Sequence, residues 1–161
     1  TTFYIEVPQK IVDPKPISEA IKEVKKPKVD EKLDCSAYTA FIVDDNNLNI
    51  KVAKRLLEQY KFKVESVTNG KDCIYKVKEG MQYDIIFMDI QMPNMNGYDA
   101  ARAIRAMDCD YCKRVPIIAM TANAFAEDIQ AAKTVGMNGH IAKPLELNVL
   151  AKTLDKWLCK K

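Results

Sequence analysis

The middle of the chain reads Ile85-Ile86-Phe87-Met88-Asp89, four apolar residues followed by an acid. Similar runs occur before and after it, Phe41-Ile42-Val43-Asp44-Asp45 and Ile117-Ile118-Ala119-Met120-Thr121. A short apolar run that ends on polar residues is typical of a buried parallel strand whose carboxyl end opens into a site. The three runs therefore predict strands of one parallel sheet with polar side chains at one edge.

Helical patterns alternate with strand patterns from residue 38 onward. Apolar residues recur with helical spacing between residues 48 and 60 and again between 147 and 158. We expect strands at 39–43, 63–68, 84–88, 115–120 and 140–142, and helices that begin near 48, 69, 97, 126 and 147. Short right-handed connections turn five such βα units into an α/β fold, a flavodoxin-like doubly wound five-stranded parallel sheet of order 2-1-3-4-5 with five helices.

Length and composition fit one domain with a tail. The chain has 161 residues, of which 48% are hydrophobic, enough for a substantial core. Its 25 basic and 22 acidic residues give a net charge of +3, too mild to indicate a nucleic-acid partner. No stretch approaches the roughly 20 apolar residues that span a bilayer, so we expect no membrane contact. Because the chain starts at Thr1 without a leader, we expect a fragment of a longer cytoplasmic protein.

Five cysteines are scattered along the chain. Their odd number suits reduced thiols better than a disulfide framework. Cys109 and Cys112 have the C-x-x-C spacing of half a zinc site or of a redox pair. A zinc site would need a second ligand pair, and the one histidine, His140, lies in another segment. We therefore expect two incidental thiols in a surface loop.

In the predicted sheet order, the ends of the first and third strands are neighbours, which would bring together Asp44, Asp45 and Asp89. Three carboxylates this close repel one another unless a cation neutralises them. Oxygen ligands from short acidic side chains suit a hard ion, Mg²⁺ or Mn²⁺. A structural alternative is that Asp44 and Asp45 merely cap the first helix. Two adjacent acids with a third on the neighbouring strand exceed what a cap needs.

Polar residues also follow the last two strands. Lys143 offers a mobile positive charge and Thr121 a hydroxyl donor, both suited to an anion held beside the acids. The anion implied is a phosphoryl group. With an unperturbed pKa of about 3.9, Asp89 is an anionic nucleophile at neutral pH and could accept that group without a general base. Catalysis would then consist of charge neutralisation and in-line positioning.

The chain thus carries four ordered motifs: Asp44-Asp45, Met88-Asp89-Ile90-Gln91-Met92-Pro93-Asn94-Met95-Asn96-Gly97, Thr121-Ala122 and Lys143-Pro144. Together they resemble the receiver domain of two-component response regulators and hybrid sensor histidine kinases. The resemblance covers the segment 38–161, which we expect to be the receiver domain.

The resemblance implies roles for single residues. Asp89 would be the phosphoacceptor, and Asp44 and Asp45 would bind the metal together with Asp89 and the backbone carbonyl of Gln91. The phosphoryl oxygens would be contacted by Thr121, the Ala122 amide and Lys143. The Lys143-Pro144 bond is expected to be cis.

A conformational switch is also implied by the resemblance. His140 occupies the place of the family's switch aromatic. Thr121 would move toward the phosphoryl group and His140 would turn inward behind it, which would reshape the nearby surface. The alternative is that His140 is simply a partly exposed strand residue. Because Gln91 and Asn123 flank the path of the attacking water, we expect them to tune the lifetime of the phosphorylated state.

The residues before the receiver domain bear on its origin. Residues 1–8 look like the last strand of a histidine kinase ATP-binding domain, although a disordered or vector-derived arm fits their alternation equally well. Prolines and interleaved charges make residues 9–37 a linker. The order kinase, linker, receiver is that of a hybrid kinase, whose parent chain could be membrane-anchored. The fragment itself has no kinase catalytic motifs.

Partners follow from the same resemblance. They are the phosphoacceptor domain of a histidine kinase, in the same chain, and a histidine phosphotransfer protein, with a homodimer as a further option. A free-standing regulator that acts by phosphorylation-dependent protein contact is the alternative function.

Two other classes fit the sequence less well. A flavodoxin-type electron carrier shares the predicted fold, but the loop after the first strand is acidic where a flavin phosphate needs hydroxyl and backbone donors. A phosphatase that uses an aspartyl phosphate usually shows Asp-x-Asp on one strand, whereas Ile90-Gln91 follows Asp89 here.

Overall fold

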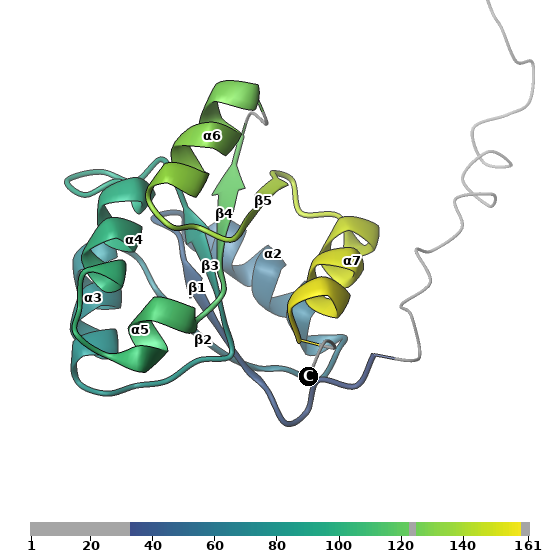
Figure 1. Ribbon diagram of the computed structural model, residues 1–161. Helices are drawn as coiled ribbons and strands as arrows, with labels where there is room; N and C mark the ends of the chain where they lie inside the picture. Colours follow the sequence, from purple (N-terminus) through teal and green to yellow (C-terminus); the bar gives the residue numbers. More distant parts are fainter. Residues whose placement is uncertain (1–32, 123–124, 159–161) are drawn as a thin grey trace, which may run out of the picture.

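Five parallel strands form the centre of the fold in the order β2-β1-β3-β4-β5 (Figure 1). The strands are β1 (Thr39–Val43), β2 (Lys63–Val67), β3 (Ile85–Asp89), β4 (Ile117–Thr121) and β5 (Gly139–Ala142). The computed structural model describes residues 33–122 and 125–158. The predicted doubly wound sheet and its order are confirmed.

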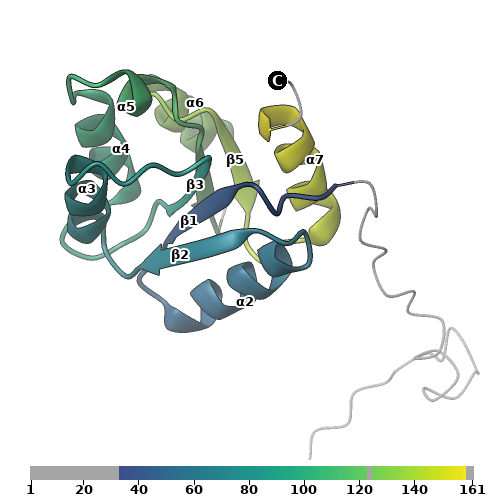
Figure 2. The same ribbon diagram turned by 90° about the horizontal axis from the view of Figure 1, so that it is seen from below.

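Helices cover both faces of this sheet (Figures 1 and 2). One face is covered by α2 (Asn47–Glu58) and α7 (Leu147–Leu158). The other is covered by α3 (Gly70–Lys78), α4 (Gly97–Arg105), α5 (Asp110–Arg114) and α6 (Ala126–Thr134). None of the helices in the described ranges combines the length and apolar character that crossing a bilayer requires.

The two helical layers explain the uninterrupted apolar runs of the central strands. Every residue of β3 and β4 is buried. Along β1, Phe41 packs with the core on the α3 and α4 side, whereas Ile42 packs with the core on the α2 and α7 side. A strand that is covered on both faces needs apolar side chains at successive positions, and each large one contributes about 1.5–3 kcal/mol on burial.

Within the described residues, α5 is a sixth helix beside the five predicted. Cys109 is its N-cap, and the Cys109 sulfur accepts a hydrogen bond from the Cys112 backbone N–H at 3.0 Å. The two cysteines form a disulfide, and Cys112 is buried in the core. The prediction of two incidental thiols in a surface loop is therefore wrong. A five-residue helix offers too few positions for an apolar repeat, and spacing alone does not reveal whether two thiols are joined.

The chain packs onto the domain before β1 begins. Cys35, within the segment expected as a linker, is buried, and its backbone N–H donates to the Tyr60 carbonyl at 2.9 Å. Leu33 packs against the same core. The expectations for residues 1–8 and for the linker up to residue 32 lie outside the described residues.

A partly exposed ion pair on β2 gives a pH-dependent prediction. Glu65 accepts hydrogen bonds from Lys76 at 2.8 Å and from the Tyr83 hydroxyl at 3.0 Å. The hydrogen bond from Lys76 lowers the pKa of Glu65 below its ordinary 4.5. Burial opposes this change, and the hydrogen bond from Tyr83 adds to it. This stabilisation is present above the ordinary pKa and is lost as the pH falls through the lowered one.

We expect Glu65→Gln to reduce the free energy of unfolding at pH 7 by less than about 1 kcal/mol, because the pair is more than a third exposed and screened by solvent. The difference from the unmodified protein should shrink as the pH falls below 4.5. Urea denaturation at several pH values measures it, with the exposed acid Glu58 changed to Gln as the control. A difference that grows on acidification would contradict the prediction.

Candidate functional site

Polar side chains from four strand ends meet at the carboxyl edge of the sheet. Asp44 follows β1 directly, Asp89 ends β3, Thr121 ends β4 and Lys143 follows β5. The Lys143 backbone N–H donates to the Thr121 carbonyl at 2.8 Å, which continues the β4–β5 pairing to this edge. The parallel arrangement thus places these residues at the switch point between β1 and β3, where open α/β sheets bind ligands.

Lys143 bridges the two buried acids. Its Nζ lies 2.7 Å from Asp44 Oδ2 and 2.8 Å from Asp89 Oδ2. Asp44 is completely buried and Asp89 is 4% exposed, whereas about a fifth of the Lys143 side chain is exposed. The site therefore holds two buried carboxylates and one partly exposed ammonium group.

Burial and charge oppose each other at this bridge. Burial raises the pKa of Asp89, and the negative charge of Asp44 raises it further. The hydrogen bond from Lys143 and the charge of that lysine lower the pKa, but the net result is a raised pKa. For Lys143 burial disfavours the charged form, but the hydrogen bonds to Asp44 and Asp89 outweigh it and raise the pKa. The lysine consequently stays protonated and compensates for the two acids.

Asp44 is fixed by donors from the start of α2. Its Oδ1 accepts the Asn46 backbone N–H at 2.9 Å, and the Asn49 side-chain amide lies 3.1 and 3.2 Å from its two oxygens. The sequence analysis missed Asn49. Its spacing of five residues from Asp44, in the first turn of a helix that starts beside the site, is the signal that could have identified it.

The capping of α2 decides between the two readings of the paired acids. The N-cap is Asn46, whose side chain accepts the Leu48 backbone N–H at 2.9 Å. The alternative that Asp44 and Asp45 merely cap the first helix is therefore wrong. Both acids are available for another role.

The acidic cluster fits a hard divalent cation. One carboxylate oxygen each of Asp44, Asp45 and Asp89 lies within 4.8 Å of the others. Three carboxylates this close could share one hard cation, directly or through its water ligands. Asp45 is exposed, which leaves one side of the cluster open to water and to a phosphate-bearing ligand. The donor set contains only oxygen, the chemistry that Mg²⁺ and Mn²⁺ prefer.

Other residues singled out in the sequence lie around this cluster. The Gln91 backbone N–H donates to Asp89 Oδ1 at 3.2 Å, and the Gln91 side chain is exposed. Ala122 is exposed directly after β4. His140 is exposed on β5 and pairs in register with Ala119 of β4. Asn123 lies outside the described residues. The predicted cis bond between Lys143 and Pro144 is confirmed.

The loop after β3 brings α4 close to Asp89. Asn94 has a φ of 63°, a left-handed conformation that asparagine tolerates, and Asn96 caps α4 by accepting the Asp99 backbone N–H at 2.8 Å. At Gly97, the first residue of α4, an added Cβ would overlap the carbonyl oxygen of Asp89. Glycine at this position thus permits the helix to approach the strand end that carries Asp89.

We expect Gly97→Ala to destabilise the domain by about 3 kcal/mol, the upper part of the range for an overpacked site, because rigid backbone must move to admit the methyl group. The matched control is Gly70→Ala in α3. Its Cβ would meet the flexible side chain of Met95 at 3.1 Å and the Ala100 Cβ at 3.2 Å but no backbone atom, so we expect a smaller loss of about 1 kcal/mol. Chemical denaturation compares the two variants, and equal losses would refute the argument from backbone overlap.

Comparison with known proteins identifies the family. The sequence model of the response regulator receiver domain matches residues 40–155. The chain belongs to this family. The receiver domain is 38% identical over 119 residues to hybrid signal transduction histidine kinase L of Dictyostelium discoideum, a match over 72% of this chain and 7% of that protein. The chain spans only 7–15% of the length of the histidine kinases that it matches.

Solved structures agree with this assignment. The receiver domain of a sensor histidine kinase from Pseudomonas aeruginosa PAO1, solved with a magnesium ion in its active site cleft, is 35% identical with a TM-score of 0.68 and covers 76% of this chain and 98% of that chain. A second structure pairs the receiver domain of a Saccharomyces cerevisiae response regulator with its histidine phosphotransfer protein; it is 29% identical with a TM-score of 0.66 and covers 76% of this chain and 89% of that chain.

Proposed function

We propose that this receiver domain takes a phosphoryl group from a phosphohistidine onto Asp89 and passes it to a histidine phosphotransfer protein. The observation that carries the proposal is the bridge of Lys143 between two buried acids, beside an exposed third acid. A buried carboxylate held between a positive charge and a metal-binding cluster is suited to attack an anionic phosphorus centre. Such an arrangement exceeds what the stability of the fold requires.

Asp89 is the group that bonds to phosphorus. In the proposed step an Asp89 oxygen forms the new P–O bond while the P–N bond to the donor histidine breaks, and the histidine nitrogen retains the electron pair and takes up a proton. The Gln91 backbone N–H holds Asp89 Oδ1 at 3.2 Å and so orients the carboxylate. Because no proton has to leave the nucleophile, the step needs no general base.

Charge neutralisation completes the site. Lys143 is already 2.8 Å from Asp89 and would transfer its hydrogen bond to a phosphoryl oxygen. Thr121 and the Ala122 amide would donate to the other oxygens. Mg²⁺ or Mn²⁺, held by Asp44, Asp45, Asp89 and the Gln91 carbonyl, would offset the repulsion between the carboxylate and the incoming phosphate. His140 would respond to the movement of Thr121, and Gln91 with Asn123 would set the lifetime of the phosphorylated state.

The kinase relatives support a place in a phosphorelay. Several relatives are histidine kinases much longer than this chain, and one related receiver was solved with a histidine phosphotransfer protein. We therefore include in the proposal a parent hybrid kinase, which supplies the phosphohistidine, and a cytoplasmic location for this domain.

A transfer assay tests the proposal. The purified chain is incubated with Mg²⁺ and acetyl phosphate, and the label is located by mass spectrometry of proteolytic fragments. The labelled protein is then mixed with each histidine phosphotransfer protein of the source organism. We expect Mg²⁺-dependent label on Asp89, absent with EDTA, and its movement to a histidine of one partner. Absence of any label would refute the proposal. Label that no partner accepts would refute the relay and favour a regulator that acts by contact.

A further inference from the structure

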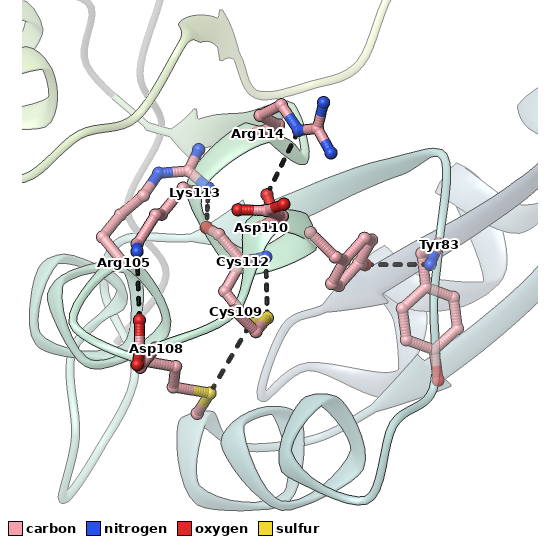
Figure 3. Close-up of a disulfide and its surroundings, with 10 residues drawn as sticks. Tyr83, Arg105, Asp108, Cys109, Asp110, Cys112, Lys113 and Arg114 are labelled. Carbon is pink, nitrogen blue, oxygen red and sulfur yellow. Dashed lines mark hydrogen bonds and ion pairs between the residues drawn. A yellow bond between two sulfur atoms is a disulfide. The ribbon is translucent and has the colours of Figure 1, made fainter.

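The disulfide lies at the opposite end of the sheet from the candidate site. Cys109 and Cys112 frame the start of α5 (Figure 3), which leads into the amino end of β4. Asp89 and Thr121, by contrast, lie at the carboxyl ends of β3 and β4. The proposed phosphoryl chemistry does not use either cysteine. A C-x-x-C disulfide at a helix start is therefore a second chemically reactive group that needs its own explanation.

Arg105 connects α5 to the starts of two strands that carry site residues. Its guanidinium donates to the Cys112 carbonyl at 2.6 Å and to the Val115 carbonyl at 2.8 Å, and on its other side to the Gly136 carbonyl at 2.9 Å and to Asn138 Oδ1 at 2.7 Å. Burial lowers the pKa of Arg105, yet its donors are matched by four acceptors. One partly buried side chain thus joins α4, α5 and the loop before β5.

Asn138 extends this connection into the sheet. Its side-chain oxygen accepts the Ile117 backbone N–H at 2.9 Å, and its own backbone N–H donates to the Ile117 carbonyl at 2.8 Å. Ile117 begins β4, which ends at Thr121, and β5 begins at Gly139, directly after Asn138. A change at Cys112 can therefore reach the first residues of both strands through Arg105 and Asn138.

Both sulfur atoms retain a structural role when the disulfide opens. Cys109 caps α5 by accepting the Cys112 backbone N–H, and Cys112 fills a buried core position with its sulfur 3.9 Å from that of Met107. The bridge encloses only two intervening residues, so its contribution through chain entropy is at the low end of the range for disulfides. The fold therefore does not depend on the bridge.

Accessibility separates this pair from the other described cysteines. Cys109 is partly exposed, whereas Cys35 and Cys73 are buried. Burial raises the pKa of the Cys73 thiol to about 12, which makes it unreactive at neutral pH. Within the described ranges, the attack of an external thiolate is thus directed to the Cys109 sulfur.

We propose that Cys109 and Cys112 form a reversible thiol–disulfide switch, driven by a dithiol reductant, that changes the order of the loop before β5. A reductant thiolate attacks the Cys109 sulfur, the Cys109–Cys112 bond breaks, and Cys112 leaves as a thiolate that takes up a proton. The second reductant thiol then attacks the sulfur of the first in the mixed disulfide and releases Cys109. Two electrons and two protons pass to the protein, and the reductant becomes a disulfide.

Reduction acts through the hydrogen bonds that the Arg105 guanidinium donates. When the bridge opens, the covalent tie at the start of α5 is lost, and the Cys112 carbonyl becomes a looser acceptor for Arg105. Losing roughly one hydrogen bond of local stability speeds amide exchange about five- to tenfold. We expect this change at Ile117 and Asn138, while amides at the start of α2 keep their exchange rates.

The first experiment measures the reduction itself, which is independent of phosphorylation. The native chain is incubated with a small dithiol, quenched in acid, denatured and alkylated. Before reduction we expect label on Cys35, Cys73 and Cys159 but on neither Cys109 nor Cys112; after reduction all five carry label. Reduction that occurs only in denaturant, or an untreated protein with all five thiols free, would overturn the proposal.

The second experiment measures the coupling by hydrogen exchange with and without the dithiol. Cys109→Ser removes the bridge but keeps a good N-cap, so it should exchange like the reduced protein and no longer respond to the dithiol. Cys159→Ser is the matched control and should respond like the unmodified chain. Unchanged exchange at Ile117 and Asn138 after full reduction would overturn the coupling. Because neither readout involves Asp89, failure of the redox proposal would not contradict the proposed phosphorelay. Failure of the phosphorelay would likewise not contradict the redox proposal.

Discussion

Asp89→Asn is expected to abolish Mg²⁺-dependent phosphorylation of the chain, with labelling reduced to background. An amide oxygen is neutral and a poor nucleophile, and no other group occupies its position between Lys143 and the Gln91 backbone N–H. Asparagine keeps the shape of the side chain, and its single oxygen can still accept one of the two bonds, so the fold should persist. Incubation with labelled acetyl phosphate and Mg²⁺ measures the effect.

The control for this variant is an acid of the same type outside the site. Asp99 is exposed on α4 and pairs with Arg102 at 2.7 Å, and Asp99→Asn should label like the unmodified protein. Circular dichroism and urea denaturation should show that both variants are folded. Label that persists at the same position in Asp89→Asn would exclude Asp89 as the acceptor.

Lys143→Met is expected to destabilise the domain by about 3 kcal/mol in the absence of divalent cations. This is the lower end of the range for breaking a buried ion pair, because part of the lysine is exposed and Asn49 still donates to Asp44. The loss arises because Asp44 and Asp89 would remain buried without their shared positive charge. Addition of Mg²⁺ should recover a large part of it, since a cation held by the same acids replaces the missing charge.

Urea denaturation with EDTA or with Mg²⁺ measures both effects. The matched control is Lys113→Met, which removes an exposed lysine paired with Asp108 at 3.2 Å and should change the free energy of unfolding by less than about 0.5 kcal/mol. Equal losses in the two variants, or no recovery with Mg²⁺, would show that the acids do not depend on Lys143.

The parallel sheet could be predicted because its strands leave a clear trace in the sequence. Strands β3 and β4 are covered on both faces, so they read as unbroken apolar runs, and each ends on the polar residue that enters the site. The chain order of those residues sufficed to place Asp44, Asp89, Thr121 and Lys143 at one edge. Their roles in phosphoryl transfer remain predictions that rest on chemistry and family.

Other features left no such trace. Helix α5 is short and capped by a sulfur, so neither an apolar repeat nor a typical N-cap residue marks it. Arg105 acts through side-chain bonds to partners such as Asn138 that the fold brings near, and such bonds have no fixed spacing. The disulfide depends on oxidation as well as position. The local pattern of apolar and polar residues therefore predicted most strands and helices. The side-chain bonds that join them depend on tertiary contacts and could not be predicted in this way.

Asn46 has a consequence for how this site can change over evolutionary time. Because Asn46 is the N-cap of α2, exposed Asp45 contributes little to the start of that helix. Substitutions at exposed Asp45 can alter the affinity or selectivity for the cation while the helix stays intact. Asn46 thus serves the helix and Asp45 the proposed cation site, so the two functions can change independently during evolution. Position 45 also offers protein engineers a place where ion preference can be tuned separately from folding.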